Sequence, residues 1–520
     1  MKYLLGLDQG TSGTKAYVMD TDGQRIGLGY VPTELIRSQP GWIEQDPRAV
    51  AVGAADAIGQ ALRSAQCSPS DIIAIGIASQ RGTDFVWDTR TRRPIANAIT
   101  WQDLRTLPII EELNAWEHAG ERRHRLGYFP GPWCASMHLS WRAQHQPEFQ
   151  AALCGDRLRI GMSASWLLTA LGEPHAHVHD YSLMQKSGLW DFRRGVYWRA
   201  WIERLGLSSI APDGLPQPVP TLYNFGTLRI SDGSRSADVP VVAMIGDQQA
   251  ALFGHDCRFA GQAECTHGTA SFVNVVAGNT PPDLDSLNIY HAWSLPPEDG
   301  DCSMPGSNLK HQSSVVEHTY CLEADTTVSG AAVRWMIERG HFFASDSELD
   351  TLAESVPDAG GVMFIPAFTG LNVPYNDHSA RATIFGLTLG TDRAHIARAF
   401  LDSLGYQLRA ILDTIRDQTG LHVQQLSVGG GLSNSDMACQ TQADLLGIPL
   451  VRPTENETTA RGAALLAGLG AGIWNDLGEL PPLPSGSTNF EPRTSQDQRD
   501  AGYARWKRAV QHVRELGENA

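Results

Sequence analysis

The chain has 520 residues, of which 42% are hydrophobic and 19% are charged, and this globular composition is too long for a single hydrophobic core. The formal net charge of −16 excludes a general nucleic-acid-binding protein, which needs a basic face. No apolar run reaches the length of a membrane span and no signal peptide is evident at the N-terminus, so we expect a cytoplasmic protein without a membrane span.

The eight cysteines are widely spaced and form no Cys-x-x-Cys pair. This pattern is typical of reduced thiols in a cytosolic enzyme rather than of a disulfide or zinc framework. Three alternate histidines, His175, His177 and His179, raise the alternative of a metal site. No cysteine or carboxylate cluster completes a ligand set, so the sequence favours a solvated loop.

The N-terminal segment reads as a β-hairpin with a polar tip. Lys2–Leu7 is a short apolar strand, Asp8 follows it, and Ala16–Met19 is the return strand. Walker loops and dinucleotide fingerprints run from a strand into a helix, so this order excludes a dinucleotide-dependent oxidoreductase. A plain turn would explain the glycines of the tip. Three hydroxyls and a cation favour instead a loop that cradles phosphate oxygens, formed by Thr11, Ser12, Thr14 and Lys15.

The next elements introduce a candidate substrate loop. Asp46 and Pro47 predict the start of a helix that continues to about Ser64. The buried strand Ile72–Ile77 leads directly to Arg81, which is either a substrate-binding cation or a salt-bridged surface residue. The aromatic residues Trp101 and Trp133 stand in polar surroundings, as in sugar pockets, although a lone tryptophan is more often a core residue. We predict a helix over Ile160–Leu171.

The chain is organised around the junction at Gly246 and Asp247. The apolar run Val239–Ile245 predicts a strand, and Ala250–Phe253 predicts the start of a buried helix. Reactive groups of α/β proteins lie outside the carboxyl ends of strands. Asp247 is therefore a candidate catalytic carboxylate, and the alternative is that it only caps the following helix.

The second half opens with a copy of the N-terminal pattern. Gly261–Thr266 is a strand, His267–Ser271 is the tip, and Phe272–Val276 is the return strand. We expect the two hairpins to grip one polyphosphate in a cleft between two halves of the chain. Further elements are a helix start near Gly330, a long helix over Arg393–Gln418, and a glycine run, Gly429–Gly431, between a strand and the helix Asp436–Leu446. Three glycines permit close approach to a flat ring.

Several of these motifs together resemble the FGGY family of carbohydrate kinases, and within it the glycerol kinases most. The motifs are Leu7–Ser12, Gly246–Leu252, His267–Thr269, Pro366–Leu371 and Gly429–Gly431. The resemblance covers nearly the whole chain, in order. It implies a two-domain α/β, actin-like ATPase (ribonuclease H-like) fold with an interdomain catalytic cleft. It also implies an N-terminal domain at 1–252 with substrate and catalytic base, and a nucleotide-binding domain at 253–520.

The resemblance also implies site residues, with ATP and Mg²⁺ as cofactors. Asp247 would be the general base, and Asp8 would hold Mg²⁺, with Asp247 as a second metal-side carboxylate. The substrate pocket would comprise Arg81, Trp133, Asp247, Gln248 and Phe272. ATP would be bound by Thr11, Ser12, Thr14, Lys15, Gly268, Thr269, Gly330, Gly431 and Ser435.

Two positions depart from the glycerol kinase pattern. Gly82 stands where those enzymes have a glutamate that binds the triol, and Trp133 stands where a tyrosine is usual. The loss of a carboxylate is expected to enlarge the pocket and to change specificity. Glycerol, a tetritol and a pentulose therefore all stay candidates. The spacing of Ser236–Asp238 favours no regulation by fructose bisphosphate, although Gly233–Arg235 leaves a shifted regulatory loop open.

The competing functions are a pentulose kinase and a non-catalytic nucleotide-binding actin-like module. Retention of Asp8, Asp247 and both hairpin tips favours an enzyme. Its partners would be ATP and a small polyol or sugar, and members of the family are often homo-oligomers. Nucleic acid is not expected among its partners.

Overall fold

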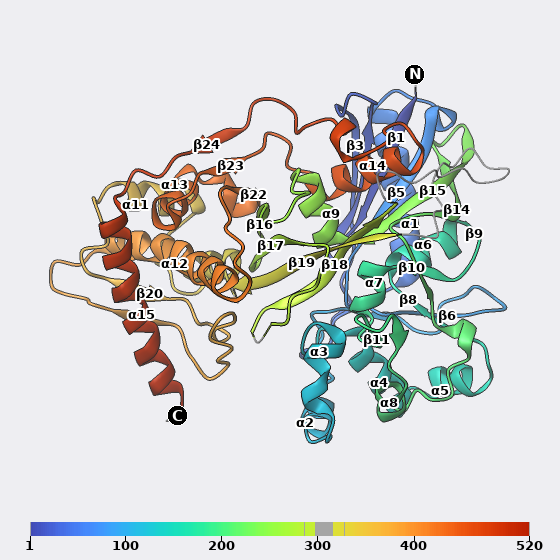
Figure 1. The fold of residues 1–520 in the computed structure, drawn as a ribbon, viewed down its shortest axis with the longest axis horizontal. Coiled ribbons are helices and arrows are strands. Elements are labelled where there is room, and N and C mark those ends of the chain that lie inside the picture. The colour runs from blue at the N-terminus through green and yellow to red at the C-terminus, as the bar shows by residue number, and fades with distance from the viewer. Residues whose placement is uncertain (1, 285, 297–315, 327, 519–520) are drawn as a thin grey trace. The chain divides into compact units, whose positions relative to one another are not determined.

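The computed structural model describes residues 2–284, 286–296, 316–326 and 328–518, and its contacts divide the chain into two units (Figure 1). The first unit comprises Met1–Asp256, Tyr290–Tyr320 and Glu457–Leu483, and the second comprises Cys257–Ile289, Cys321–Asn456 and Pro484–Ala520. The division at residues 252 and 253 stays a prediction. The contact-based first unit differs from it because Glu457–Leu483 returns to that unit late in the chain.

The first unit is built on a seven-stranded sheet of order β3-β2-β1-β5-β15-β14-β9. The central neighbours β1, β5 and β15 run parallel, and the other pairs in this sheet are antiparallel. The carboxyl ends of the three parallel strands therefore meet at one edge. The strands are β1 (Tyr3–Gln9), β2 (Gly13–Met19), β3 (Arg25–Pro32), β5 (Ile72–Ser79), β9 (Gly172–Pro174), β14 (Leu222–Ser231) and β15 (Ser236–Gly246).

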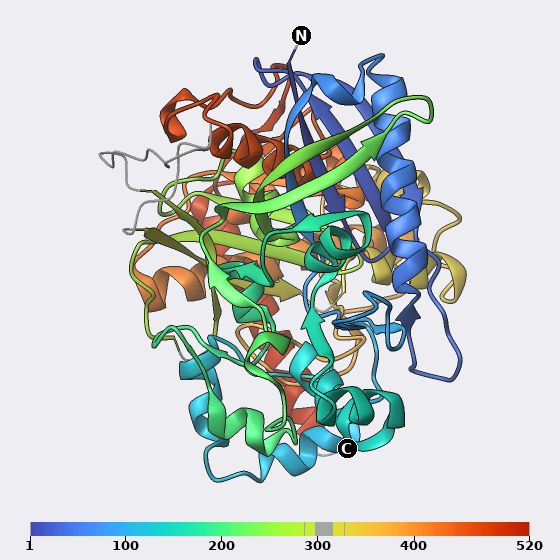
Figure 2. The ribbon, with the colours of Figure 1, turned by 90° about the vertical axis from the view of Figure 1, so that its right-hand side faces the viewer.

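Helices cover both faces of this sheet. Helix α1 (Pro47–Ser64) packs on β2 and β3, and α14 (Thr458–Gly470) packs on β1 and β5. Figure 2 shows α1 running alongside the blue N-terminal strands. The predicted cap of α1 is confirmed, because Asp46 accepts from the Arg48 N–H at 2.9 Å. Leu5, Leu7, Ile75 and Ile77 of the sheet join Ala54 and Ile58 of α1 in one buried cluster.

The remaining helices of the first unit are shorter. Two of them, α7 (Tyr181–Lys186) and α9 (Asp247–Gly254), lie next to β15. The others are α2 (Leu107–Asn114), α3 (Arg122–Leu126), α4 (Ala135–His145), α5 (Pro147–Cys154), α6 (Ser163–Leu171) and α8 (Arg199–Arg204). Among the described residues, the unit also contains four two-stranded ribbons, with strands β4 (Glu44–Gln45) and β7 (Ala98–Ile99), β6 (Phe85–Asp88) and β8 (Leu158–Gly161), β10 (Val178–Asp180) and β13 (Gln217–Val219), and β11 (Trp190–Asp191) and β12 (Val196–Tyr197).

The helix predicted over Ile160–Leu171 was wrong at its start. Ile160 lies in β8 and pairs with Val86 of β6, and α6 begins only at Ser163. A short apolar run does not distinguish a strand from a buried helical segment, and here the pairing with β6 decided.

The solvated loop predicted at the histidines was also wrong for His179. This residue lies in β10, is buried, and its Nε2 is 2.8 Å from the Ser165 Oγ. Burial lowers the pKa of His179 to about 3, so the ring is neutral. Among the described residues, no cluster of three or more His, Cys, Asp or Glu side chains could hold a metal ion.

A second seven-stranded sheet has the order β18-β19-β17-β16-β22-β23-β24. Strands β16, β22 and β23 are parallel neighbours, whereas β16 with β17 and β23 with β24 are antiparallel. The strands are β16 (Ala263–His267), β17 (Ser271–Gly278), β18 (Asn288–Leu295), β19 (Glu317–Thr326), β22 (Leu426–Gly430), β23 (Leu450–Arg452) and β24 (Thr488–Phe490).

The long helix predicted in the second unit is confirmed as α12 (Arg393–Thr419). Its Phe400 and Leu404 pack with Met336 and Phe364 in a buried cluster. The other helices are α10 (Gly330–Glu338), α11 (Asp346–Glu354), α13 (Asp436–Leu446) and α15 (Gln496–Glu518), and β20 (Met363–Ile365) pairs with β21 (Thr383–Phe385). Among the described residues, no helix combines the length and apolar character that a membrane crossing requires.

The internal repeat inferred from two hairpins extends to the order of the strands. Strands β2-β1-β5-β15 of the first sheet correspond to β17-β16-β22-β23 of the second. In each sheet the first strand of the hairpin pairs in parallel with the next strand in this order. The tip of each hairpin therefore lies at the edge where its own sheet presents the carboxyl ends of parallel strands.

Candidate active site

Asp247 is the first residue of α9, directly after β15 ends at Gly246. Gly246, and not Asp247, is the N-cap of this helix, so capping does not account for the carboxylate. The Asp247 Oδ1 accepts from the Gln248 N–H at 2.8 Å, and a quarter of the Asp247 side chain is exposed. The position keeps a carboxylate oriented and open to a ligand.

Arg81 contacts Asp247 directly. Its Nε donates to the Asp247 Oδ1 at 3.0 Å, and its side chain is only 7% exposed, so the alternative of a surface arginine was wrong. The pair forms because Ser79, at the end of β5, lies opposite Gly246, at the end of β15. The guanidinium also lies over the Tyr290 ring, with 5.5 Å from its central carbon to the ring centroid.

Asp8 occupies the same edge of the sheet, one strand further on. Its register places it beside Ala78 of β5 and opposite Lys15 of β2. Burial raises the pKa of the Asp8 carboxyl to about 7; the charge of Lys15 opposes this shift, and the charges of Asp247 and Glu457 add to it. A divalent cation would relieve this crowding of negative charge, so Asp8 fits the predicted metal site.

The tip of the first hairpin is tied to a neighbouring loop through Thr11. The Thr11 hydroxyl donates to the Gln80 Oε1 at 3.2 Å and accepts from the Trp101 Nε1 at 2.7 Å. Ser12 is exposed, and the Lys15 Nζ is 2.5 Å from the Glu457 Oε2. The hydroxyl of Thr14 is buried and is the least accessible of the predicted phosphate contacts.

Gly82 does not leave the open space that the loss of a glutamate predicted. It adopts a φ of +78°, and a Cβ added there would lie 2.3 Å from the Trp133 carbonyl oxygen and 3.3 Å from the Trp101 Cβ. The backbone of Trp133 fills the position where a side chain would begin. The enlarged pocket predicted at Gly82 was therefore wrong, although the Trp133 side chain itself is 42% exposed.

Gly82→Glu is expected to damage the site rather than to create a binding site for glycerol. A side chain in left-handed backbone costs about 1–2 kcal/mol before any clash, and the Trp133 backbone has to move as well. We expect a lower melting temperature and a kcat/KM for any polyol reduced by about tenfold or more. Gly120→Ala is the control, because nothing lies within 4 Å of the added Cβ. Unchanged stability with improved use of glycerol would contradict this prediction.

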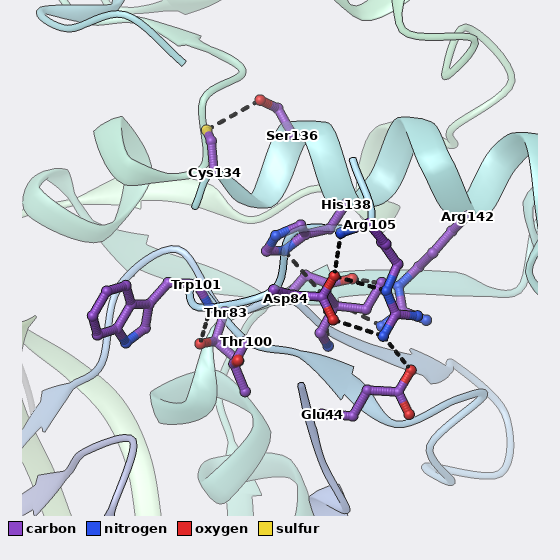
Figure 3. A network of polar contacts seen from close by, with 12 residues as sticks. Glu44, Thr83, Asp84, Thr100, Trp101, Arg105, Cys134, Ser136, His138 and Arg142 are labelled. Atoms are coloured by element: carbon purple, nitrogen blue, oxygen red, sulfur yellow. Dashed lines mark hydrogen bonds and ion pairs between the residues drawn. The ribbon is translucent and has the colours of Figure 1, made fainter. Parts of the chain in front are cut away.

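A buried ion-pair network holds the segment that follows Gly82 (Figure 3). Both carboxylate oxygens of Asp84 accept from Arg142, at 2.5 and 3.2 Å, and Oδ1 also accepts from the Ile99 N–H at 3.0 Å. Burial raises the pKa of Asp84, but Arg142 and His138 outweigh it and keep this pKa below its usual value. The buried Arg105 forms two further ion pairs, with Asp103 and with Glu44, at 2.8 Å each. These contacts fix the loop that carries Arg81.

In the second unit, the hairpin tip binds the start of α10. The Gly330 N–H donates to the Gly268 carbonyl at 3.1 Å, and the Ser329 and Ala331 N–H groups donate to the Thr269 carbonyl at 3.1 Å. Gly330 is required by this approach, since a Cβ there would lie 2.6 Å from the Gly268 oxygen. The predicted contacts Gly268, Thr269 and Gly330 are thus brought together, with Gly268 and Thr269 exposed.

The glycine run lies beside the same tip. Gly430 pairs with His267 in the parallel ladder, and the space around Gly431 is open. Ser435 caps α13 and donates to the Asp350 Oδ1 at 2.7 Å. Phe272 is half-buried in β17, opposite Thr266. Gly431 and Ser435 therefore flank an exposed backbone turn next to Gly268.

His267 gives the second hairpin a predicted dependence on pH. Its ring is buried between the Ser271 Oγ at 2.7 Å and the Gln442 Oε1 at 3.1 Å, and burial lowers its pKa to about 4. In the unfolded chain the His267 ring takes up a proton near pH 6.5. The stability that the buried neutral ring contributes is therefore fully present above that pH and is lost as the pH falls towards 4. The unfolding free energy of the native chain relative to His267→Gln should fall by about 2–3 kcal/mol between pH 7 and 4.5.

Urea unfolding of both proteins at the two pH values measures this difference. His422→Gln, at an exposed position of the same unit, serves as the control. A difference between the native chain and His267→Gln that does not change with pH would show that this ring does not govern acid stability.

Comparison with known proteins decides the family. Residues 3–254 match the N-terminal domain and residues 263–471 the C-terminal domain of the "FGGY family of carbohydrate kinases". The chain belongs to this family. It is a carbohydrate phosphotransferase from an ATP-dependent kinase family, and the predicted two-domain α/β fold is confirmed.

Relatives of this FGGY kinase match it over the full length. It is 35% identical to "Glycerol kinase 2" of Sulfolobus acidocaldarius over 98% of both chains. It is 37% identical to "Glycerol kinase" of Aromatoleum aromaticum over 99% of both chains. The fold is similar to a Plasmodium falciparum glycerol kinase with ADP (TM-score 0.87, 24% identity, 99% of this chain and 98% of that one). A xylulose kinase from Brucella ovis gives a TM-score of 0.83 at 24% identity, covering 99% of this chain and 100% of that one.

Sequence reasoning missed two residues of the site in the first unit. Glu457, just before α14, binds Lys15, and Tyr290 lies beside Arg81. Neither residue belongs to a motif, and both are more than 200 positions from the hairpin or loop that they contact. Only the return of their segments to the first unit brings them to this edge.

Proposed function

We propose that this kinase transfers the γ-phosphoryl group of ATP to a primary hydroxyl of a small polyol, with glycerol as the first candidate and a tetritol as the second. The observation that supports this most directly is the Arg81–Asp247 pair at the carboxyl ends of neighbouring parallel strands. Full-length relatives that carry the name glycerol kinase support the choice of substrate.

Asp247 is the proposed general base. Arg81 and the Gln248 N–H both donate to the Asp247 Oδ1, which fixes the plane of the carboxylate. The carboxylate accepts the proton of the substrate hydroxyl as that oxygen attacks the γ-phosphorus, and ADP leaves. Arg81 and Gln248 also provide donors beside the hydroxyls of the bound polyol.

The two hairpin tips are the proposed contacts of ATP. Thr11, Ser12, Thr14 and Lys15 in the first unit, and Gly268 and Thr269 in the second, would bind phosphate oxygens through N–H groups, hydroxyls and the ammonium. Lys15 must share its charge between the phosphates and Glu457. Gly330, Gly431 and Ser435 of the second unit would bind the rest of the nucleotide.

Mg²⁺ fits the carboxylates of the first unit. Asp8 would hold it, with Asp247 as the second carboxylate, because magnesium in phosphoryl-transfer sites uses one or two carboxylates together with substrate phosphates. When bound, Mg²⁺ supplies neutralisation of the charge on the phosphate oxygens.

Selectivity is expected from the Trp133 segment. The Trp133 carbonyl oxygen stands beside Gly82, where a glycerol kinase has a carboxylate. A carbonyl oxygen accepts hydrogen bonds without bringing a charge, so it can hold a polyol hydroxyl in place of that glutamate. Trp133 and, in the second unit, Phe272 would contact the carbon chain of the substrate.

A panel of glycerol, erythritol, xylulose, ribulose and gluconate, with ADP release and product analysis, tests this proposal. A kcat/KM that is highest for glycerol or erythritol, with a phosphorylated primary hydroxyl, is expected. A pentulose kinase is the second candidate, favoured by the fold's similarity to a xylulose kinase, and a highest kcat/KM for xylulose or ribulose would replace the polyol assignment.

Three further properties belong to the proposal. A cytoplasmic location and a homo-oligomer are expected from the family resemblance. Regulation by fructose bisphosphate is not expected, because the Arg235 Nε is bound to the Asp232 Oδ2 at 3.0 Å within its own turn. Addition of fructose bisphosphate to the active assay should leave the rate unchanged.

A further inference from the structure

Strand β15 loses its antiparallel partner shortly before it reaches Asp247. The Met244 N–H donates to the Thr221 carbonyl at 3.1 Å, but the Thr221 N–H already turns away to the Ser294 carbonyl. Gly246, two residues after Met244, points its N–H to the same side, since backbone N–H groups alternate along a strand. It donates to the Ser182 Oγ at 2.8 Å. A side-chain hydroxyl therefore replaces the missing strand at the last residue before Asp247.

The Ser182 hydroxyl is itself fixed by Asp180. Both carboxylate oxygens of Asp180 lie 2.9 Å from the Ser182 Oγ. Asp180 also accepts from the Ser182 and Leu183 N–H groups and from the Thr221 Oγ1, at 3.2, 3.1 and 3.3 Å. Both side chains are fully buried. Because the Ser182 Oγ accepts from the Gly246 N–H, a lone pair of this oxygen faces Gly246 and its O–H donates to Asp180.

This arrangement keeps a carboxylate in an unfavourable place. Burial raises the pKa of Asp180 to about 7, although its four donors favour the ionised form. Asp180 has two roles. It caps α7, and it binds the Ser182 hydroxyl that accepts from the Gly246 N–H. Ser182 lies in the first turn of α7. Its Oγ therefore joins α7 to Gly246, the residue directly before α9.

We propose that Asp180 and Ser182 are positioning residues for catalysis, holding the Gly246 backbone so that the Asp247 carboxylate meets the substrate hydroxyl. The inference rests on the proposed role of Asp247 as general base. Arg81 holds the Asp247 side chain from β5, and Ser182 holds its backbone from α7. A shift of the carboxylate by about 1 Å can cost 10²-fold in rate.

Ser182→Ala tests the proposal, since it removes the acceptor of the Gly246 N–H. Asp180 still caps α7 in this variant, because it accepts from backbone N–H groups. We expect kcat to fall about 10- to 100-fold, with the KM for ATP within twofold of the native value. The sharper measurement is a double-mutant cycle with Asp247→Asn. If Ser182 acts through Asp247, Ser182→Ala should have no further effect on kcat in the Asp247→Asn background.

Ser403→Ala is the matched control. Ser403 lies in α12 of the second unit and is as buried as Ser182, and its hydroxyl donates to the Phe400 carbonyl at 2.6 Å. Its kcat should stay within twofold of the native value. Asp180→Asn adds an amide donor and so turns the Ser182 hydroxyl away from its native direction. Like Ser182→Ala, it should lower kcat in the native background and should have no further effect on kcat in the Asp247→Asn background.

Three results would overturn the proposal. The first is an unchanged kcat in folded Ser182→Ala. The second is the same fold-loss in the native and Asp247→Asn backgrounds, which would mean that Ser182 acts on the fold and not on the base. The third is failure of both Ser182→Ala and Asp180→Asn to fold, which would assign these residues to stability alone. Full activity of Asp247→Asn by itself would instead refute the base assignment, so the two failures are distinguishable.

Discussion

Asp247→Asn is expected to lower kcat about 10²- to 10⁴-fold, the contribution that a general base typically makes. The amide keeps the size of the side chain and can still accept from Arg81 and the Gln248 N–H, which bind one oxygen. It cannot take the proton of the attacking hydroxyl. The dissociation constant for ADP should stay within about threefold of the native value. A general base acts in the transition state, so its loss lowers kcat without weakening the binding of the nucleotide in the ground state.

Polyol-dependent ADP release and calorimetric titration with ADP measure the two quantities. Asp238→Asn is the control, since Asp238 lies in β15, the strand that precedes Asp247, is exposed, and pairs only loosely with Arg229 at 3.4 Å. A kcat within a few-fold of the native value in Asp247→Asn would refute the assignment of the base. Loss of ADP binding together with kcat would show instead that the substitution damages the fold of the first unit.

Asp84→Ala is expected to be the most destabilising single change near the site. It leaves the Arg142 guanidinium buried without its carboxylate, and it removes the acceptor of the Ile99 N–H. Breaking a buried ion pair such as Asp84 with Arg142 (Figure 3) costs about 3–5 kcal/mol. The loop that carries Arg81 would lose this anchor. We expect a marked fall in melting temperature and a higher KM for the polyol, both measured on the purified variant.

A surface pair provides the control for Asp84→Ala. Glu173 and Arg92 are bonded at 2.9 Å but are 74% and 50% exposed, so Glu173→Ala should leave the melting temperature unchanged. The double variant Asp84→Leu with Arg142→Met should recover much of the lost stability, because an apolar pair can replace a buried ion pair. Equal melting temperatures for Asp84→Ala and the native protein would contradict the role given to this network.

The strand-to-helix junction and both hairpins could be predicted from local patterns. An apolar run, a glycine and an acid before a small-residue helix specify β15, Gly246, Asp247 and α9, because periodicity and capping act over a few residues. The parallel pairing of β1 with β5 and of β5 with β15 then brings Asp8, Arg81 and Asp247 to one edge. Motif order also predicted the family, which the domain matches confirmed.

The predictions that were wrong concern positions whose surroundings are set by long-range contacts. The histidine segment looks solvated in sequence, but β10 places His179 in the core. Gly82 looked like a deleted side chain, whereas its φ of +78° and the Trp133 carbonyl show a tight backbone crossing. Local composition contains no information on which distant backbone will fill a space.

By itself the sequence determined the order of the elements, the two hairpin tips, the acid after β15 and the family of kinases, since each depends on neighbours within a few residues or on motif order. Only the tertiary structure decided that Arg81 is buried against Asp247, that Glu457 binds Lys15, and that Ser182 completes the ladder at Gly246. These contacts join residues 64 to 442 positions apart, and packing of the sheet and its helices alone selects such partners.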